Sequence, residues 1–243
     1  MKKIFALLCL IAGFSPAASA AEFTALGALN TTEFRALSED FGAAFSYKSL
    51  QPAEPLGITG FDVSVEATST DISKSGAALK LATAGALDVT RIIIPKLHVS
   101  KGLPFGLDVS ASMAAVPSTN IKLVGAELRY AILKGGIAMP AIALRGAMSR
   151  MTGVDQLSFD TKSLDLSISK GFLMFTPYAG FGTVWVNSTP NLTANPNNLA
   201  ALSFNLPKAF VGVNVNLGLM NFALEGDKTG DASSASFKFG FRW

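Results

Sequence analysis

The chain has 243 residues, of which 49% are hydrophobic and only 15% are charged. Its formal net charge of +3 falls to about +1 without Lys2 and Lys3, so composition gives no support for nucleic-acid binding, which needs a clustered basic face. Beyond the first 20 residues there is no apolar run of about 18 residues, which excludes transmembrane helices.

The first 20 residues have the layout of a secretory signal peptide. Two lysines precede an apolar run over residues 4–14, and Ala18-Ser19-Ala20 offers small residues for cleavage before residue 21. Cys9, the only cysteine, lies in this run without the small preceding residue that lipidation needs. We therefore expect a signal peptide (1–20), an N-terminal helix with its linker (21–56) and a barrel (57–243), with no thiol chemistry in the mature chain.

A short amphipathic helix is predicted over Thr31–Phe45. Asn30 and Glu33 have the spacing of a capping box, and four apolar residues follow at helical intervals, namely Phe34, Leu37, Phe41 and Phe45. Pro52 and Pro55 are expected to end the helix. It is predicted to fill the barrel lumen or shield one mouth. A membrane-surface anchor is disfavoured because the polar face is not rich in lysine.

After Pro55 the hydrophobic period changes to two, which predicts an all-β fold, an antiparallel transmembrane barrel of about ten strands. Alternate links are tight, as periplasmic turns are, whereas residues 73–89 and 188–201 form longer outer links, the first with room for a short helix. The predicted strands are Ile58–Ile72, Thr90–Lys101, Phe105–Val116, Asn120–Lys134, Ala138–Met151, Leu157–Lys170, Leu173–Asn187, Leu202–Leu217, Leu219–Asp227 and Ala232–Trp243.

The last strand has one wholly aromatic face. Its odd positions are Phe237, Phe239, Phe241 and Trp243, and its even positions from Ser236 are polar or glycine. Alternate side chains of a strand face opposite sides, so the aromatic face is predicted to meet lipid, with Trp243 at the interfacial girdle.

Strand parity also predicts which charged residues face the lumen. The set is Asp62, Glu66, Lys96, His98, Asp108, Glu127, Arg129, Arg145, Asp165, Lys208, Glu225, Lys238 and Arg242. Barrel closure is expected to bring Lys238 and Arg242 against Asp62 and Glu66. Buried charges must be paired or hydrated, so the favoured interpretation is a paired structural core, and the alternative is a narrow, charge-selective conduit.

One pair of residues raises the question of catalysis. His98 and Ser100 share a strand face, and His-x-Ser occurs in outer-membrane lipid A deacylases. However, parity turns His98 away from lipid, and its strand ends at a tight turn predicted to be periplasmic, whereas lipid A lies in the outer leaflet. This position also excludes an omptin-like protease. Because no phosphate loop, metal-ligand cluster or nucleophile elbow occurs, we expect no enzyme, no cofactor and no metal.

The signal peptide, the strand containing Pro177-Tyr178-Ala179-Gly180-Phe181-Gly182 and the aromatic last strand together resemble the broad superfamily of small bacterial outer-membrane β-barrels, of the OmpA, OmpX and OmpW kind. The resemblance covers the chain from about Ile58. It implies two partners, outer-membrane lipid and the barrel assembly machinery, which engages the C-terminal strand. The extra strands and the helix depart from eight-stranded members, so no functional residues carry over.

Three functions follow as expectations. The first is a non-enzymatic outer-membrane protein, either a structural barrel or a narrow porin-like channel that the N-terminal helix plugs. The second is a surface-binding module that uses outer loops such as residues 188–201. The third, and least favoured, is a lipid-modifying enzyme.

Overall fold

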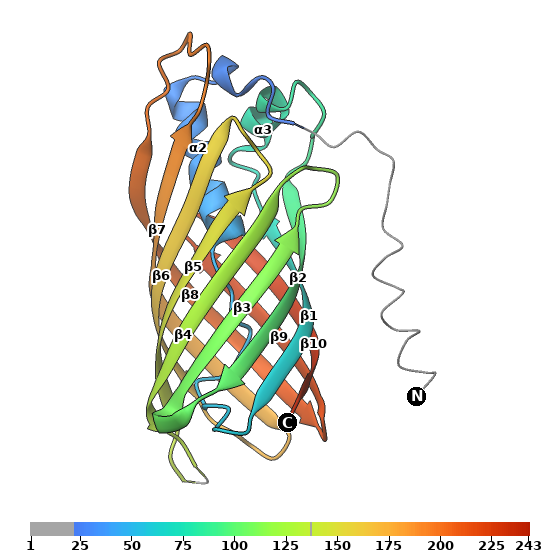
Figure 1. The fold of residues 1–243 in the computed structure, drawn as a ribbon, viewed down its shortest axis with the longest axis vertical. Helices are drawn as coiled ribbons and strands as arrows, with labels where there is room; N and C mark the ends of the chain where they lie inside the picture. Colours follow the sequence, from blue (N-terminus) through green and yellow to red (C-terminus); the bar gives the residue numbers. More distant parts are fainter. Residues whose placement is uncertain (1–21, 137) are drawn as a thin grey trace, which may run out of the picture.

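The computed structural model describes residues 22–136 and 138–243, so the predicted signal peptide lies outside the described residues. Ten antiparallel strands follow one another in chain order, and the last pairs with the first, which closes the sheet into a barrel (Figure 1). This confirms the predicted fold class. The strands are β1 (Phe61–Asp71), β2 (Arg91–Gly102), β3 (Leu107–Ala115), β4 (Lys122–Lys134), β5 (Ala141–Thr152), β6 (Leu157–Ser169), β7 (Phe175–Pro190), β8 (Leu202–Leu217), β9 (Met220–Thr229) and β10 (Ala232–Arg242).

The barrel has two different ends. We call the end that carries the C-terminus, the links 135–140, 170–174 and 218–219, and the short helix η2 (Pro104–Gly106) the turn end. The loop end carries the long links 72–90 and 191–201 and the helices η1 (Leu26–Ala28) and α3 (Gly76–Ala82) (Figure 1).

Two strands extend further toward the loop end than predicted. β7 continues to Pro190 because its last residues still pair with the start of β6, so the following loop begins at residue 191. β9 continues to Thr229, which pairs with both Lys208 and Ala232. The link between β9 and β10 is therefore only residues 230–231, a tight turn rather than a loop.

The helix α2 (Thr31–Phe45) has the predicted bounds and lies inside the loop-end half of the barrel (Figure 1). It contacts β1, β5, β7, β8, β9 and β10, strands that surround it. The capping box is present, with Asn30 Oδ1 accepting from the Glu33 amide and Glu33 Oε2 accepting from the Asn30 amide, both at 2.9 Å. The predicted cause of the helix end was wrong. The backbone is already extended at Ser46, well before Pro52.

The apolar face of α2 packs into an apolar core that the loop-end half of the barrel encloses. Phe41 is fully buried, and its ring centroid lies 4.6 Å from that of Phe45 and 6.1 Å from that of Phe159 on β6. Helix and wall are in close contact at Gly42, where a Cβ atom would lie 2.7 Å from Val186 Cγ2. The inward residues that complete this core include Ile92, Ile94, Leu123, Met151, Leu157, Val184 and Leu206.

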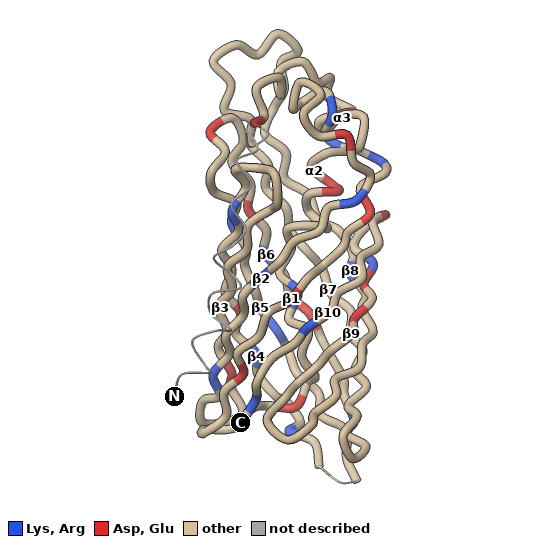
Figure 2. The backbone as a smooth tube through the Cα atoms, turned by 90° about the vertical axis from the view of Figure 1, so that its right-hand side faces the viewer, with Lys and Arg blue, Asp and Glu red and all other residues tan. Residues whose placement is uncertain are grey.

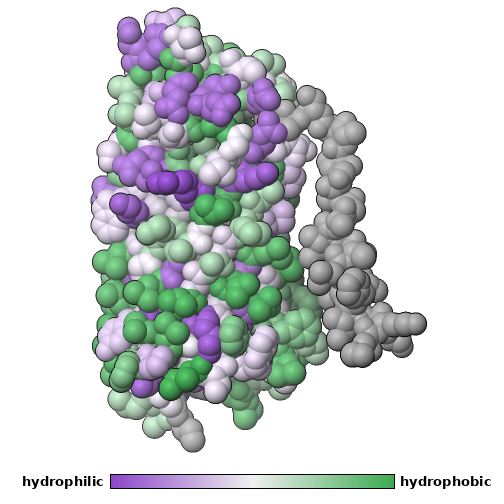
Figure 3. Space-filling model, viewed as in Figure 1, coloured by the Kyte–Doolittle hydropathy of each residue, from purple (hydrophilic) through white to green (hydrophobic). Residues whose placement is uncertain are grey.

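The polarity of the exterior also changes along the barrel axis, but opposite to that of the interior. In the turn-end half the outward side chains are apolar, as Leu128, Phe181 and Val211 are, and together they form an exterior apolar belt. In the loop-end half the outward positions carry polar side chains, among them Lys122, Arg150, Ser158, Lys162, Asn205 and Lys228. Figure 3 shows these two zones, hydrophobic below and hydrophilic above. The outer surface is therefore apolar in the turn-end half, as in membrane-spanning barrels, and polar in the loop-end half, as in water-soluble proteins.

Within the described residues, no helix is both long and apolar enough to cross a membrane.

Candidate functional site in the barrel lumen

The turn-end half of the lumen contains an extended stretch of the chain, residues 46–56, which we call the inner segment. It begins where α2 ends and leads to β1 at the turn end (Figure 1). Most of its residues are buried, although it has no helical or strand structure of its own. Its backbone and side-chain polar groups must therefore find partners on the barrel wall.

These partners come from all around the barrel. The inner segment has polar contacts with β2, β3, β4, β6 and β8, and an ion pair of Lys48 adds β9. The contacts are Tyr47 Oη to His98 Nε2 (2.8 Å), Lys208 Nζ to Tyr47 O (3.2 Å), Ser49 Oγ to Glu127 Oε1 (3.0 Å), Gln51 Nε2 to Ser100 Oγ (2.8 Å), Arg129 Nη1 to Pro52 O (2.8 Å), Ala53 N to Ser169 Oγ (3.1 Å) and Leu56 N to Asp108 Oδ1 (3.1 Å).

Lys48 makes the one ion pair between the inner segment and the wall among the described residues. Its Nζ atom lies 2.9 Å from Oδ1 of Asp227 on β9, and it also donates to the carbonyl oxygen of Ala43 at 3.1 Å. On the other side of the same residue, Lys96 Nζ of β2 donates to the Lys48 carbonyl oxygen. Lys48 thus connects the helix end with two separate strands.

The prolines of the inner segment suit an enclosed position. Pro52 and Pro55 have no N–H group, so each removes a donor that would otherwise need a partner in the lumen. Each also favours an extended conformation at the residue before it. The prolines therefore keep the inner segment extended rather than terminate α2.

The seam between β1 and β10 is an ion-paired cluster. Asp62 forms ion pairs with both Lys238 and Arg242, with N–O distances of 2.7 Å and 2.8 Å. Glu66 lies directly opposite Lys238 in the register, but its ion pair is with Lys96 on β2, at 2.7 Å. Charges of opposite sign thus occupy neighbouring strands on both sides of β1 (Figure 2).

The structure places the other residues of the predicted lumen set on the inner face of the wall. Asp108 with Arg129 (2.7 Å) and Asp165 with Lys208 (3.0 Å) form buried ion pairs. Lys96 and Arg242 are partly buried, with 12% and 20% of their side chains exposed. The buried members are Asp62, Glu66, His98, Asp108, Glu127, Arg129, Arg145, Asp165, Lys208, Glu225 and Lys238.

Arg145 differs from the other cations because no carboxylate lies within ion-pair distance of it among the described residues. Its guanidinium lies 4.4 Å from the ring centroid of Phe210, and Lys208 approaches the same ring at 5.4 Å. A cation over an aromatic face is attracted by the ring quadrupole, and this holds Arg145 against β8.

His98 lies in a chain of buried hydrogen bonds. Its Nδ1 atom is 2.7 Å from Glu66 Oε1, while its Nε2 atom lies 2.8 Å from the Tyr47 hydroxyl and 3.4 Å from Ser100 Oγ. These are the residue types of a nucleophile, a base and an orienting acid. However, Tyr47 of the inner segment occupies the Nε2 side, and His98 and Ser100 are both 1% exposed. In this arrangement a substrate has no access to the serine.

The Tyr47 ring has a matching space on the wall. It packs edge-on against His98 and lies over Gly125 of β4, where a Cβ atom would come within 2.7 Å of the ring. A glycine at this position therefore lets the inner segment approach β4 closely.

Cavities of different size lie beside α2. One of about 30 Å³, between the end of α2 and β2–β5, has room for one or two waters and is lined in part by Tyr47, Lys48 and Lys96. The other, of about 270 Å³, lies at the loop end between α2 and the ends of β8–β10, beside Arg35, Lys74 and other residues.

The loop over residues 191–201 covers the start of the described chain. The Asn197 amide donates to the carbonyl oxygens of Gly27, Ala28 and Leu29, at 3.2, 3.1 and 3.0 Å. Leu192 and Leu199 pack in or against the apolar core. The loop that sequence analysis proposed for surface binding is thus partly engaged with the N-terminal segment.

The predicted lumen set contains His98, Asp108, Glu127, Arg129 and Lys208, which bind the inner segment, but it lacks Asp227, which pairs with Lys48. Asp227 is the last residue of the predicted strand Leu219–Asp227 and has the same parity as Glu225, so strand parity alone could have placed it in the lumen set. Two charged residues of the N-terminal segment are also buried: Lys48 pairs with Asp227, and Asp40 accepts from the backbone and hydroxyl of Ser75, at 2.9 and 2.7 Å.

The four aromatic residues near the end of the chain run from the middle of β10 to the turn end. Phe237, Phe241 and Trp243 are exposed, by 46%, 41% and 57%, on the outside of the barrel. Trp243 stacks on Phe61 with ring centroids 5.5 Å apart, while Phe239 packs against Phe222 of β9.

The fold is remotely similar to several solved structures. The N-terminal β-barrel domain of OprF from Pseudomonas aeruginosa is 14% identical over 75% of this chain and 97% of that one, with a TM-score of 0.36. The translocator domain of the autotransporter NalP from Neisseria meningitidis is 10% identical over 94% and 99%, with a TM-score of 0.39. The outer-membrane protease OmpT from Escherichia coli is 9% identical over 76% and 95%, with a TM-score of 0.39.

No protein-family model matches the chain, and no curated protein matches it in sequence. A closed sheet of ten antiparallel strands, with an apolar exterior belt and a polar lumen in its turn-end half, has the architecture of a transmembrane β-barrel.

Proposed function

We propose that this protein is a non-enzymatic β-barrel of the bacterial outer membrane, whose lumen is closed by its own N-terminal segment. The turn end faces the periplasm and the loop end faces the outside. In this resting state α2 fills the outer half of the lumen and the inner segment fills the periplasmic half. The barrel conducts ions only when that segment moves.

One observation carries the proposal: the inner segment has polar contacts with six of the ten strands. A peptide attached to one side of a wide pore leaves a path on the other side. A peptide attached to β2, β3, β4, β6, β8 and β9 leaves no continuous path, because a ten-stranded barrel is only slightly wider than its own side chains.

The buried charges support the same interpretation. In an open conduit, water would hydrate the charged side chains. Here the side chains of two ion pairs, Lys48 with Asp227 and Arg129 with Asp108, are at most 2% exposed. Such pairs are costly to break, since a single unpaired buried charge costs about 3–5 kcal/mol. The inner segment is therefore held firmly rather than loosely docked.

Conductance of the refolded protein in planar bilayers of phosphatidylcholine tests closure. We expect the wild type to be silent and the triple variant Lys48→Ala/Ser49→Ala/Gln51→Ala to show discrete openings, because it removes contacts to β9, β4 and β2. The matched control is Lys80→Ala/Ser73→Ala/Asn191→Ala, which removes the same residue types, with Asn191 in place of Gln51, from the links and helix α3 at the loop end. Steady openings of the wild type would overturn the proposal.

Catalysis by His98 is not part of this function, because Tyr47 holds the ring nitrogen that would accept the Ser100 proton. Mass spectra of lipid A from cells that carry the wild type or His98→Ala are expected to be identical. A modified lipid that appears only with the wild type would show an enzyme instead.

A further inference from the structure

Three basic residues lie outside the barrel, directly above the exterior apolar belt, on three successive strands. On the loop-end side of each strand, the next outward residue is Lys122 after Val124 on β4, Arg150 after Met148 on β5 and Lys162 after Leu164 on β6. Val124, Met148 and Leu164 are exposed by 48%, 58% and 45%, as lipid-facing residues are. Each cation is thus the first polar residue that a lipid chain would meet on its strand.

The register places the three cations at one level. Val124 pairs with Arg150, and Met148 pairs with Lys162, so the polar boundary steps by two residues from each strand to the next. Because the strands tilt by about 45°, residues at the same height on adjacent strands are offset by roughly one and a half residues in the register. Only every second residue faces outward, so the offset between outward residues is two. Neighbouring cations are then diagonal partners, with Cβ atoms about 7–8 Å apart.

None of the three side chains has an ion pair or hydrogen bond to another described residue, unlike most cations at this end. Lys80 pairs with Asp88 at 2.7 Å, and Arg91 lies 3.6 Å from Asp71. The nearest carboxylate in the register is Asp160, opposite Arg150, and it accepts from Asn187 at 3.0 Å instead. Like charges on adjacent strands repel, so the bare cluster is destabilising unless an anion binds.

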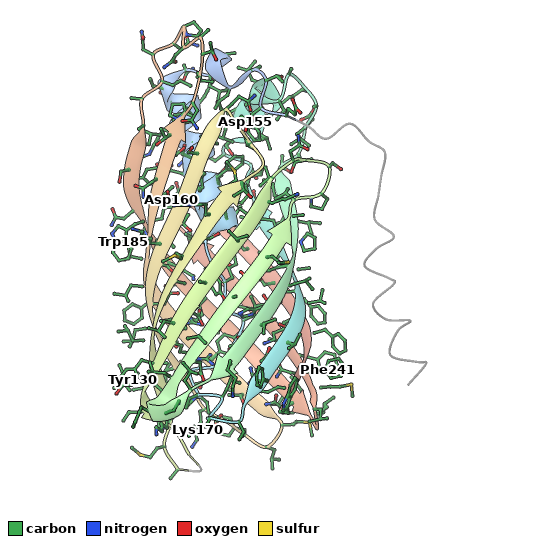
Figure 4. The ribbon with its side chains drawn as sticks, viewed as in Figure 1. Tyr130, Asp155, Asp160, Lys170, Trp185 and Phe241 are labelled. Atoms are coloured by element: carbon green, nitrogen blue, oxygen red, sulfur yellow. The ribbon has the colours of Figure 1, made fainter. Side chains whose placement is uncertain are left out.

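An aromatic residue completes this surface. Trp185 lies directly opposite Lys162 in the register and is 44% exposed. Figure 4 shows Trp185 well above Tyr130, with Asp160 above it, so Trp185 lies at the upper edge of the apolar belt and Tyr130 near its lower edge. Tryptophan side chains favour this headgroup level of a membrane. The belt on β4 from Val124 to Ile132 is about 20 Å tall at a tilt of about 45°, close to the thickness of an outer-membrane apolar layer.

We propose that Lys122, Arg150 and Lys162, with Trp185 beside them, bind the phosphate groups of a phosphorylated glycolipid in the outer leaflet. Arginine and lysine are suited to phosphate, arginine through two parallel hydrogen bonds and lysine as a point charge. The acyl chains of the same lipid lie along Val124, Met148 and Leu164 below. A soluble anion would gain only the first of these contacts. The proposal rests on the outer-membrane placement of the barrel.

The test is a titration of the refolded full-length mature protein in nonionic detergent, with bis-phosphorylated lipid A as the probe and native mass spectrometry as the readout. Lys122→Ala/Arg150→Ala/Lys162→Ala is expected to weaken binding by about 100-fold, because each cation near an anionic lipid surface contributes about fivefold. The control Lys80→Ala/Arg91→Ala/Lys228→Ala removes the same charge elsewhere at the loop end and should change affinity less than threefold. Circular dichroism checks that both variants fold.

Four results would overturn the proposal: equal weakening by both triple variants, no weakening by the first, equal binding of dephosphorylated lipid A, or displacement of the lipid by millimolar inorganic phosphate. Closure of the lumen is measured in phosphatidylcholine bilayers that lack this lipid. The failure of one proposal therefore leaves the other standing.

Discussion

The Nζ atom of Lys48 lies 2.9 Å from Oδ1 of Asp227, and their side chains are only 2% and 0% exposed. The two residues are 179 positions apart in the chain, one in the inner segment and the other on β9. Among the described residues, this is the ion pair that joins the inner segment to the wall. The free energy needed to break it therefore contributes to how firmly the inner segment is held.

Loss of one partner of this pair should be far more harmful than loss of both. We expect Lys48→Met or Asp227→Leu alone to lower the free energy of unfolding by about 3–5 kcal/mol, because each leaves a buried charge without its partner. The double variant should recover most of that loss. Urea unfolding in detergent micelles measures all four proteins, and the exposed Lys80→Ala, with an effect below about 1 kcal/mol, is the control. Additive losses would contradict the account.

The close packing of α2 predicts a graded effect of side-chain size at Gly42. A Cβ atom there would lie 2.7 Å from Val186 and 3.0 Å from Leu206, so Gly42→Ala should destabilise the barrel and Gly42→Val should do so more, by about 1–3 kcal/mol or above. Gly226 on the outside of β9 has no atom within 4 Å of such a Cβ. Thermal unfolding of Gly226→Val should therefore show a much smaller loss, and equal losses at both sites would argue against a helix packed inside the barrel.

A salt-bridge cluster at the loop end predicts a dependence on pH. Lys74 Nζ lies 2.7 Å from Glu39 and 2.9 Å from Asp231. The hydrogen bond to Glu39, and then that to Asp231, raises the pKa of Lys74. The hydrogen bond from Lys74 also lowers the pKa of Asp231. Partial burial opposes ionisation of Glu39, but its hydrogen bonds with Lys74 and Arg35 together lower its pKa.

The sign of the pH effect follows from these shifts. The two carboxyl groups have lower pKa values in the folded state, so their stabilisation is present above their ordinary values, near pH 4, and is lost as pH falls through the folded values. Lys74 stays charged throughout this range. The difference in unfolding free energy between wild type and Lys74→Met should therefore be positive at pH 7 and approach zero near pH 2. A difference that stays constant with pH would show that Lys74 acts through packing alone.

The two ends of the barrel differ in their predicted exposure on cells. Glu22 is exposed at the loop end, where it accepts from Asn120 at 3.2 Å, and Leu173 is exposed at the turn end. Glu22→Cys should react with a membrane-impermeant maleimide on intact cells, and Leu173→Cys only after the outer membrane is permeabilised. The sole natural cysteine, Cys9, lies in the predicted signal peptide, so the background is low. The reverse labelling pattern would invert the proposed orientation.

The sequence predicted strands and helix well because their signals are local. An alternation of period two defines each strand, and the capping box at Asn30 with the stripe through Phe41 defines α2. The pattern could not reveal that the barrel changes polarity along its axis. Ile92 and Ile94 are inward and apolar because α2 packs against this half of the wall. Where a strand extends beyond the membrane, parity alone cannot show which of its faces is buried.

The inner segment was beyond reach for a related reason. Residues 46–56 have no periodicity, and their structure is determined by partners far away in the chain, such as His98 for Tyr47 and Arg129 for Pro52. From sequence, Pro52 and Pro55 only indicated the end of a helix. In the fold they belong to an extended peptide that the wall surrounds. The one sequence signal for such a peptide was the large number of inward charges, which need partners inside a narrow barrel.

A disulfide between α2 and the wall tests closure most directly. Ser38 Oγ on α2 lies 2.9 Å from Ser188 Oγ on β7, so Ser38→Cys/Ser188→Cys can lock the helix inside, whereas Thr70→Cys/Ser234→Cys, whose hydroxyls are 3.0 Å apart, locks only the seam of the wall. Both pairs are introduced into the Lys48→Ala/Ser49→Ala/Gln51→Ala background, and bilayer conductance is recorded before and after reduction. The account predicts silence of the oxidised helix-locked protein, openings once it is reduced, and openings of the seam-locked protein in both states. Openings of the oxidised helix-locked protein equal to those of the reduced form would contradict it.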